Sequence, residues 1–426
     1  MKAIIDCNSF YCSCERLFKP HLDRKPVIVL SNNDGCIISR SDEAKKFGVE
    51  MAGPYFKAKP LIEKYGIATF SSNYNLYGDL SWRVMETLRM ILGKSNVEVY
   101  SVDEAFLDLS MYPINELQTV AENILDTVEM WTGIKVSIGV APTKVLAKVA
   151  NRLSKKDKSI KCVMVLDTED KIIDALDKTP AGDVWGIGRQ YAEKLRDYHA
   201  VFTALDLRNK KIEWAKNNLG GVTGIKLLKE LKGEIANEME DELVNKKMIM
   251  TTRMFGHPVT NIADIKEAIA TYTSKAAEKL RRQHSTANVI SIFIVAKQQD
   301  YLSNFKRGQP KHAHTTLSLA TSCTSDLIKS SVALVDKIYD KDLSYKKAGV
   351  MLSGLVPDTA TQTNLFEELP VNNKRLLMSM MDNINFSMRD DILKFAASGT
   401  TRDWKMRQEL RSPRYTTRWE ELSEVK

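Results

Sequence analysis

The chain contains 426 residues, enough for about two to four domains at the usual 100–200 residues per domain. Apolar residues make up 43% and charged residues 27%, and no uninterrupted apolar stretch approaches the roughly 18–20 residues that a membrane-spanning helix needs. This composition excludes a membrane-spanning protein and global disorder. Asp6 stands where a secretory signal needs its apolar core, and the six cysteines form no Cys-x-x-Cys pair, so we expect a cytoplasmic protein with reduced thiols.

The first 165 residues alternate between strand-like and helix-like segments. Short apolar runs predict strands at residues 2–6 and 26–30. Residues 97–109 alternate apolar and polar side chains on both sides of Asp103-Glu104, which predicts two strands joined by a tight turn. The remaining predicted elements are a helix at 115–131, a strand at 134–140 and a helix that Pro142 opens and that runs through Leu153. We therefore predict an α/β or α+β core.

The rest of the chain changes character twice. Residues 168–235 are largely helical in pattern, and the acidic, lysine-rich stretch 229–247 is the expected linker. Residues 248–356 follow the order strand-helix-strand-strand-helix-strand, which predicts a separate α+β domain. Its predicted elements are strands at Lys247–Phe255, Asn288–Ala296 and Lys347–Leu352 and helices near 264–284 and 325–340. After Pro357 the chain is polar and then helical, and we expect an appendage without strands.

The positive charge is concentrated in one segment. Residues 246–347 hold 17 Lys/Arg and 8 Asp/Glu, a net charge of +9, whereas the whole chain carries +8. This segment is a candidate surface for a polyanion. A solvated face with a chance asymmetry of charge is the alternative.

Three carboxylates mark a candidate metal site. Asp6 ends the first predicted strand, and Asp103 and Glu104 occupy the predicted turn. Adjacent residues of a strand point to opposite faces, so Asp103 and Glu104 share a site only if the turn breaks the alternation. Carboxylates gathered at a strand edge suit Mg²⁺, and two such ions about 3.5–4 Å apart can catalyse phosphoryl transfer. Taken alone, strand-end carboxylates are more often simply solvated.

Six short motifs occur in a fixed order along the chain. They are Asp6-Cys7-Asn8-Ser9-Phe10-Tyr11, Ser31-Asn32-Asn33-Asp34-Gly35-Cys36, Glu43-Ala44-Lys45-Lys46-Phe47-Gly48-Val49, Ser71-Ser72-Asn73-Tyr74, Tyr100-Ser101-Val102-Asp103-Glu104-Ala105-Phe106 and Ser412-Pro413-Arg414-Tyr415-Thr416-Thr417. With these motifs the sequence resembles the Y-family translesion DNA polymerases nearly from end to end. The resemblance implies an error-prone, template-directed DNA polymerase that acts in the SOS response to DNA damage.

The same resemblance implies an α+β, right-hand polymerase fold. Its expected parts are a palm at 1–165 with small fingers inserted at about 20–75, a helical thumb at 166–240, a little finger at 246–356 and a C-terminal tail at 357–426.

The resemblance also assigns roles to individual residues. Asp6, Asp103 and Glu104 would ligate two Mg²⁺ ions together with the main-chain carbonyl of Cys7. Tyr11 would be the steric gate that excludes a ribose 2′-hydroxyl, with Phe10 packed beside it. The other expected contacts to the incoming nucleotide are Ser39, Lys45 and Lys155. Asp42 departs from the tyrosine that many relatives place near the phosphates, so we expect no tyrosine-type contact there.

Two further features concern DNA. Residues 185–195 predict a helix-hairpin-helix, in which Gly186, Gly188 and Arg189 would approach a backbone phosphate. Lys144, Lys148 and Arg152 recur every four residues and share a helix face, which would meet either DNA or solvent.

The tail segment 362–366 resembles the motif that binds the bacterial sliding clamp, in which Leu365 and Phe366 would be apolar anchors and Gln362 would fix the register. In the family such a tail also associates with a UmuD′-type dimer and the RecA filament.

The residues, taken without the family resemblance, leave two other functions open. A two-metal nuclease would use similar carboxylates, although it has no need for a sugar gate such as Tyr11 or for lysines that face a triphosphate. A noncatalytic DNA-binding or clamp-binding subunit is disfavoured because all three carboxylates are present.

Overall fold

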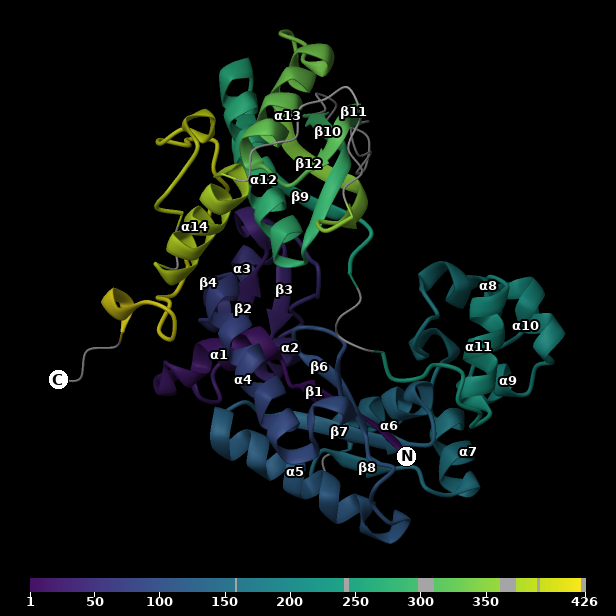
Figure 1. Cartoon of the computed structure of the whole chain (residues 1–426). Coiled ribbons are helices and arrows are strands. Elements are labelled where there is room, and N and C mark those ends of the chain that lie inside the picture. The colour runs from purple at the N-terminus through teal and green to yellow at the C-terminus, as the bar shows by residue number, and fades with distance from the viewer. Residues whose placement is uncertain (158, 241–244, 298–309, 361–372, 389–390, 423–426) are drawn as a thin grey trace.

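The computed structural model describes the chain except residues 158, 241–244, 298–309, 361–372, 389–390 and 423–426. Its described part contains three sheets of five, three and four strands, separated by helices (Figure 1). Among the described residues, no helix combines the length and the apolar character that crossing a bilayer requires.

The five-stranded sheet is built around the first strand. Its order is β5-β6-β1-β7-β8, with β1 at Lys2–Cys7, β5 at Val97–Val99, β6 at Glu104–Asp108, β7 at Val136–Ala141 and β8 at Val163–Val165. The predicted hairpin is confirmed, because β5 and β6 pair antiparallel with Val97 opposite Leu107. Ala3 and Ile5 of β1 pack toward α4 (Tyr74–Leu92) and α5 (Leu117–Thr132), whereas Ile4 packs toward α6 (Lys144–Lys156). The period of two along β1 therefore directs Asp6, like Ile4, to the face that α6 covers.

The helix α6 begins two residues later than predicted, at Lys144 rather than at Pro142. Thr143 is its N-cap, and the Thr143 hydroxyl accepts a hydrogen bond from the Leu146 amide at 3.4 Å. A threonine cap satisfies one of the free N–H groups of the first turn, which a proline cannot do.

The three-stranded sheet lies within the stretch expected to form the fingers. Its order is β3-β2-β4, with β2 at Val27–Leu30, β3 at Ile37–Arg40 and β4 at Ala68–Ser71. The helices α1 (Phe10–Leu17), α2 (Asp42–Lys46) and α3 (Tyr55–Tyr65) accompany it.

A helical unit follows the five-stranded sheet and lies at the right of Figure 1. It contains α7 (Glu169–Asp177), α8 (Arg189–His199), α9 (Ala204–Arg208), α10 (Ile212–Asn218) and α11 (Val222–Leu231). The element directly before the Gly186-x-Gly188 hairpin is a 3₁₀ turn at Ala181–Asp183, so the predicted first helix of the helix-hairpin-helix is shortened to this turn.

The four-stranded sheet has the predicted order of elements along the chain. Those elements are β9 (Ile249–Val259), α12 (Ile262–Arg282), β10 (Ser285–Ala296), β11 (Pro310–Thr321), α13 (Thr324–Ile338) and β12 (Tyr345–Pro357). The spatial order is β11-β10-β12-β9, so β11 is an edge strand. The bounds of β11 are not predicted from the sequence.

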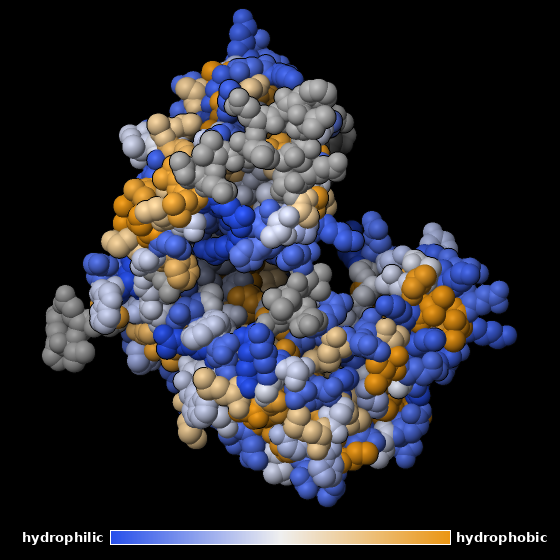
Figure 2. All heavy atoms as spheres, in the orientation of Figure 1, coloured by the Kyte–Doolittle hydropathy of each residue, from blue (hydrophilic) through white to orange (hydrophobic). Residues whose placement is uncertain are grey.

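Among the described residues beyond Pro357 the chain forms α14 (Asn373–Ser387) and no strand, as predicted, but the expectation of an appendage is wrong. After α14 the chain contacts two separate parts of the molecule. Trp404 is buried in the core of the four-stranded unit, and Arg411 forms a parallel bridge with Ser71 of the three-stranded sheet. The outer side of α14 is apolar, and an orange patch lies over this helix in Figure 2, where Leu376, Leu377, Met380 and Phe386 are exposed.

Candidate active site

Strand pairing brings the predicted carboxylates to one end of the five-stranded sheet. Asp6 of β1 lies directly opposite Glu104 of β6 in the antiparallel register, so their side chains leave the same face of the sheet. Asp103 stands one residue before β6, and its carbonyl accepts a hydrogen bond from the Cys7 amide at 2.8 Å. Residues nearly 100 positions apart in the chain thus form one acidic edge.

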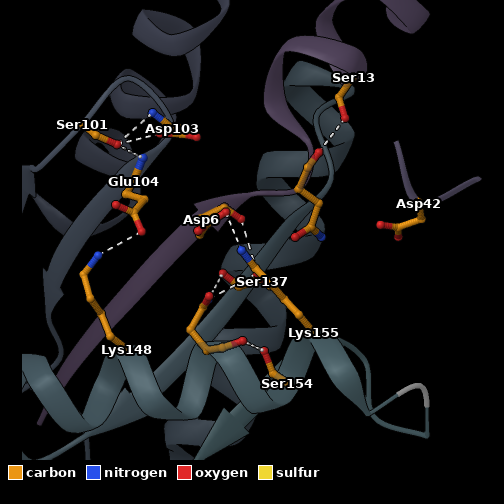
Figure 3. Close-up of polar contacts among 12 residues, drawn as sticks. Asp6, Ser13, Asp42, Ser101, Asp103, Glu104, Ser137, Lys148, Ser154 and Lys155 are labelled. Carbon is orange, nitrogen blue, oxygen red and sulfur yellow. Dashed lines mark hydrogen bonds and ion pairs between the residues drawn. The ribbon is translucent and has the colours of Figure 1, made fainter. Parts of the chain in front are cut away.

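Ser101 holds the turn that presents two of these carboxylates. Its hydroxyl donates to Asp103 Oδ1 at 2.6 Å and accepts from the amides of Asp103 and Glu104 at 3.3 and 3.0 Å (Figure 3). This turn breaks the alternation of the strand, as a site shared by Asp103 and Glu104 requires. Ser101 belongs to the motif around Asp103-Glu104, but no role for it is predicted from the sequence.

Two lysines of α6 form ion pairs with two of the three carboxylates of the acidic edge. Lys155 Nζ lies 2.6 Å from Asp6 Oδ1, and Lys148 Nζ lies 3.0 Å from Glu104 Oε1 (Figure 3). The two lysines are seven residues apart, so two helical turns place them on the same side of α6. The spacing from Lys155 was the signal in the sequence that points to Lys148.

The face of Lys144, Lys148 and Arg152 changes from buried to exposed along α6, since the Lys144 side chain is 3% exposed and that of Arg152 is 41% exposed. Lys144 is buried and pairs with Glu98 at 2.5 Å, while Arg152 pairs with Asp183. Each of the three cations thus has a carboxylate partner within the protein.

The Lys148 ammonium also lies against aromatic rings. It is 4.6 Å from the ring centroid of Tyr100 and 5.4 Å from that of Trp185, both within cation–π range. The Trp185 indole donates to Tyr100 Oη at 3.1 Å. Because Trp185 directly precedes Gly186, the hairpin of the helical unit contacts the acidic edge through Lys148.

Burial raises the pKa of Asp6 to about 6, and the neighbouring carboxylates of Glu104 and Asp103 act in the same direction. Lys155 opposes this shift but does not cancel it. The acidic edge therefore favours additional positive charge. Burial also raises the pKa of the Cys7 thiol well above its usual value, so Cys7 offers a carbonyl oxygen rather than a thiolate.

The donor set at this edge fits Mg²⁺ in chemistry. Three carboxylates and a backbone carbonyl are hard oxygen donors of the kind that Mg²⁺ prefers. In the part of the chain that the structure describes, no three His, Cys, Asp or Glu side chains converge closely enough to hold a metal ion. At the acidic edge the three carboxylates do not converge because each is turned toward a different partner (Figure 3). Asp6 faces Lys155, Asp103 faces Ser101 and Glu104 faces Lys148.

Tyr11 stands close to the acidic edge on the first turn of α1, five residues after Asp6. Its ring stacks on Tyr77 of α4 with a centroid distance of 4.5 Å and an angle of 17°, and it meets Tyr74 edge-on at 6.1 Å. Burial raises the pKa of Tyr11 to about 12, so the phenol stays neutral. Phe10 is buried in the core and contacts Tyr11 at 5.7 Å, which makes it a support for that ring rather than a surface for a nucleotide.

The other predicted nucleotide contacts are engaged elsewhere. Ser39 is buried on β3, with its hydroxyl 3.3 Å from the Cys12 thiol. Lys45 is half-exposed on α2 and pairs with Asp42 at 2.7 Å. The structure thus brings Lys155 to the acidic edge but not Lys45, and Asp42 serves as the partner of Lys45.

The predicted DNA contacts lie at the start of α8. Gly186 has a φ of 96°, which favours glycine, and Gly188 is the N-cap of the helix. The Arg189 side chain is exposed and pairs with Glu193 at 3.2 Å. The candidate clamp residues Gln362, Leu365 and Phe366 lie outside the described residues.

Family models match three parts of the chain. Residues 5–152 match the impB/mucB/samB family, and residues 246–365 match the impB/mucB/samB family C-terminal domain. Residues 375–425 match a domain of unknown function, DUF4113.

Curated relatives cover the whole chain. Protein UmuC of Salmonella typhimurium is 38% identical over 432 residues, which span 100% of both chains. Protein MucB of Escherichia coli is 34% identical over 99% of both chains. DNA polymerase IV of Staphylococcus aureus is 27% identical over 85% of this chain and 97% of its own length.

Solved structures share the fold. A Y-family DNA polymerase chimera of Dbh and Dpo4 superposes with a TM-score of 0.67 at 20% identity, covering 84% of this chain and 100% of the chimera. An insertion ternary complex of Dbh DNA polymerase gives a TM-score of 0.56 with the same coverage. The fold is that of a right-hand polymerase with palm, fingers, thumb and little finger. The chain therefore belongs to the impB/mucB/samB family of Y-family translesion DNA polymerases and is a DNA-directed DNA polymerase.

Proposed function

We propose that this polymerase adds dNTPs to a primer 3′ end by two-metal nucleotidyl transfer, and that it copies damaged templates during the SOS response. The observation that carries the proposal is the register of Asp6 opposite Glu104, with Asp103 held beside them and Tyr11 nearby. An acidic edge next to a ring that can inspect a sugar suits nucleotide addition. A nuclease has no use for such a ring.

The acidic residues would hold two Mg²⁺ ions. Asp6, Asp103, Glu104 and the Cys7 carbonyl are the ligands that we assign. When bound, the ions would activate the primer hydroxyl and stabilise the leaving pyrophosphate. Lys155 and Lys148 would be released from the carboxylates when metal charge replaces theirs, and Lys155 would then be free to pair with triphosphate oxygens.

Tyr11 would select the sugar. Its ring is backed by the stacked ring of Tyr77, so a ribose 2′-hydroxyl would collide with a supported surface. Ser39 and Lys45 are assigned to the nucleotide by resemblance. Lys45 must leave Asp42 before it can bind a phosphate, and Ser39 is buried beside Cys12.

Primer–template DNA would be held without regard to sequence. The start of α8 offers the backbone amides near Gly186 and Gly188 to a phosphate, and Arg189 is exposed there. The basic segment 246–347 would add phosphate contacts from the little finger, which makes binding sensitive to salt.

Protein partners are proposed by resemblance. The motif with Gln362, Leu365 and Phe366 would bind the bacterial sliding clamp, and the tail would associate with a UmuD′-type dimer and the RecA filament. The exposed apolar side chains of α14 support the view that this tail has a protein partner.

Primer extension tests the function. Full-length protein with Mg²⁺, dNTPs and a primer on an undamaged or abasic template should lengthen the primer, with and without clamp and a UmuD′-type partner. Asp103→Ala should reduce extension by roughly 10³-fold or more, because several kcal/mol of charge stabilisation depend on the metals. Asp108→Asn, at the other end of β6, is the matched control and should retain extension. Shortening of the primer instead of extension would support a nuclease, and equal extension by Asp103→Ala would remove the catalytic assignment.

A further inference from the structure

The motif at Ser412–Thr417 has no part in the chemistry above, yet its start is buried against another motif, Ser71–Tyr74. The Ser71 amide donates to Leu410 O at 3.0 Å, and the Leu410 amide donates to Ser71 Oγ at 2.9 Å. Gln408 Nε2 donates to Ser72 O at 2.9 Å. The tail thus continues the edge of the three-stranded sheet, and Ser71, Ser72 and Ser412 are all buried.

Asn73 fixes the tail to the start of α4. Its Nδ2 group donates to Ser412 O, Ser412 Oγ and Pro413 O at 3.0, 3.1 and 3.1 Å. Its Oδ1 atom accepts from the Leu76 amide at 3.4 Å as the N-cap of α4. One buried side chain therefore ties the tail to the helix that carries Tyr74 and Tyr77.

A chain of contacts leads from Ser412 to Tyr11. Ser412 Oγ donates to Glu15 Oε1 at 2.9 Å, and Tyr77 Oη donates to the same oxygen at 2.7 Å. The Tyr77 ring stacks on Tyr11 at 4.5 Å. Glu15 is fully buried, and its second oxygen has no hydrogen-bond partner among the described residues. Its orientation therefore depends on the hydroxyls of Ser412 and Tyr77.

We propose that the C-terminal segment 408–415 is a positioning element of the nucleotide pocket, in which Ser412 maintains sugar selection by Tyr11 through Glu15 and Tyr77. The inference rests on the proposed gate role of Tyr11. Tyr77 stacks on Tyr11, whose proposed task is to discriminate by shape, so a displacement of the Tyr77 ring should weaken sugar selection more than it weakens catalysis. The inference also gives a role to part of the domain of unknown function at 375–425.

The test measures the ratio of kcat/KM for a dNTP to that for the matching rNTP, with full-length protein, Mg²⁺ and primer–template DNA. Ser412→Ala should lower this ratio about tenfold, because one of the two hydrogen bonds that the buried Glu15 carboxyl group receives is lost. The kcat for the dNTP should fall by less than about threefold, since no catalytic group is touched. Ser412→Thr keeps the hydroxyl and should retain most of the selection.

Ser398→Ala is the matched control in the same tail. Ser398 is also buried, but its hydroxyl has no partner among the described residues, so the ratio should stay unchanged. Tyr77→Phe keeps the ring that stacks on Tyr11 and removes the hydroxyl that donates to Glu15. It should lower the ratio as Ser412→Ala does, and it provides the measurement if Ser412→Ala does not fold.

Tyr11→Ala separates the two proposals. If Tyr11→Ala leaves sugar selection unchanged, the gate assignment fails. Suppose that Tyr11→Ala abolishes sugar selection but that a folded Ser412→Ala or Tyr77→Phe protein retains the parent ratio. The gate role of Tyr11 is then supported, and the inference about the tail is overturned. When the inference holds, adding Ser412→Ala to Tyr11→Ala lowers the ratio no further, because both changes act through one ring.

Discussion

The Ser101 side chain holds the turn that presents Asp103 and Glu104 at the candidate active site. Its hydroxyl contacts the Asp103 carboxylate and the amides of Asp103 and Glu104, so Ser101→Ala frees the turn that presents both carboxylates. We expect primer extension to fall by roughly 10- to 100-fold, as when a group that orients a metal ligand is removed. Steady-state extension at saturating dNTP measures the effect.

Ser110→Ala is the control for this change at the residue scale. Ser110 makes the same kind of bond, from its hydroxyl to Asp108 Oδ1 at 2.6 Å, but at the opposite end of β6. Its loss should leave extension within about twofold of the parent, since exposed polar substitutions cost little. Equal losses in both variants would mean that the Ser101 turn has no special role.

Some site residues could be predicted from the sequence alone, and others could not. Asp6, Asp103 and Glu104 were predicted as one site because a family motif surrounds each of them, and the register of β1 and β6 brings them to one edge. The sequence predicts that Lys148 meets DNA or solvent, whereas it pairs with Glu104; its seven-residue spacing from Lys155 indicates the shared side of α6 but not this partner. No function of Ser412 is predicted from the sequence, because its partners Asn73 and Glu15 are 339 and 397 positions away.

At the scale of elements, local patterns predicted the strands that are buried on both sides. β1 is a short apolar run, whereas the strand β6 is predicted from the alternation of apolar and polar residues; the burial of their central residues, and of β7, makes the hydrophobic signal strong. β11 is a polar edge strand that pairs only with β10, so its residues are mostly exposed or half-exposed and carry no such signal. The packing of the tail is not predictable from its own sequence, because its contacts are made with residues that lie far away along the chain.

The packing of α6 on β7 gives a prediction at the same scale. A Cβ atom at Gly139 would lie 2.2 Å from the Asn151 amide nitrogen and 2.3 Å from Ala147 O, both backbone atoms of α6. Gly139→Ala should therefore push away the helix that carries Lys148 and Lys155, and should destabilise the protein by about 2 kcal/mol or more. The urea midpoint and primer extension should both fall.

Gly78→Ala is the matched control for the packing argument. Gly78 lies within α4, and a Cβ atom there meets nothing within 4 Å. Alanine should stabilise this helix by roughly 0.5–1 kcal/mol, because it restricts the unfolded chain. A Gly139→Ala protein as stable as Gly78→Ala would show that α6 does not rest closely on the sheet.

For the whole molecule, the returning tail joins the little finger to the fingers. Trp404 packs edge-on against Tyr272 at 5.8 Å, and its indole donates to Glu267 Oε1 at 3.0 Å. Eight residues later, Ser412 is bound to Asn73 beside the three-stranded sheet. The segment between them is therefore anchored at both ends, so loosening one anchor should loosen the other.

Trp404→Ala tests this coupling. Removing a buried indole, only 4% exposed here, should cost about 3–5 kcal/mol locally and release the little-finger anchor. We then expect the amides of residues 407–412 to exchange with deuterium at least about tenfold faster, because local opening becomes easier. Trp419, 85% exposed in the same tail, supplies the control Trp419→Ala, which should leave this exchange unchanged. Faster exchange confined to the residues next to position 404 would mean that the two anchors act independently, and that the fingers hold the tail without help from the little finger.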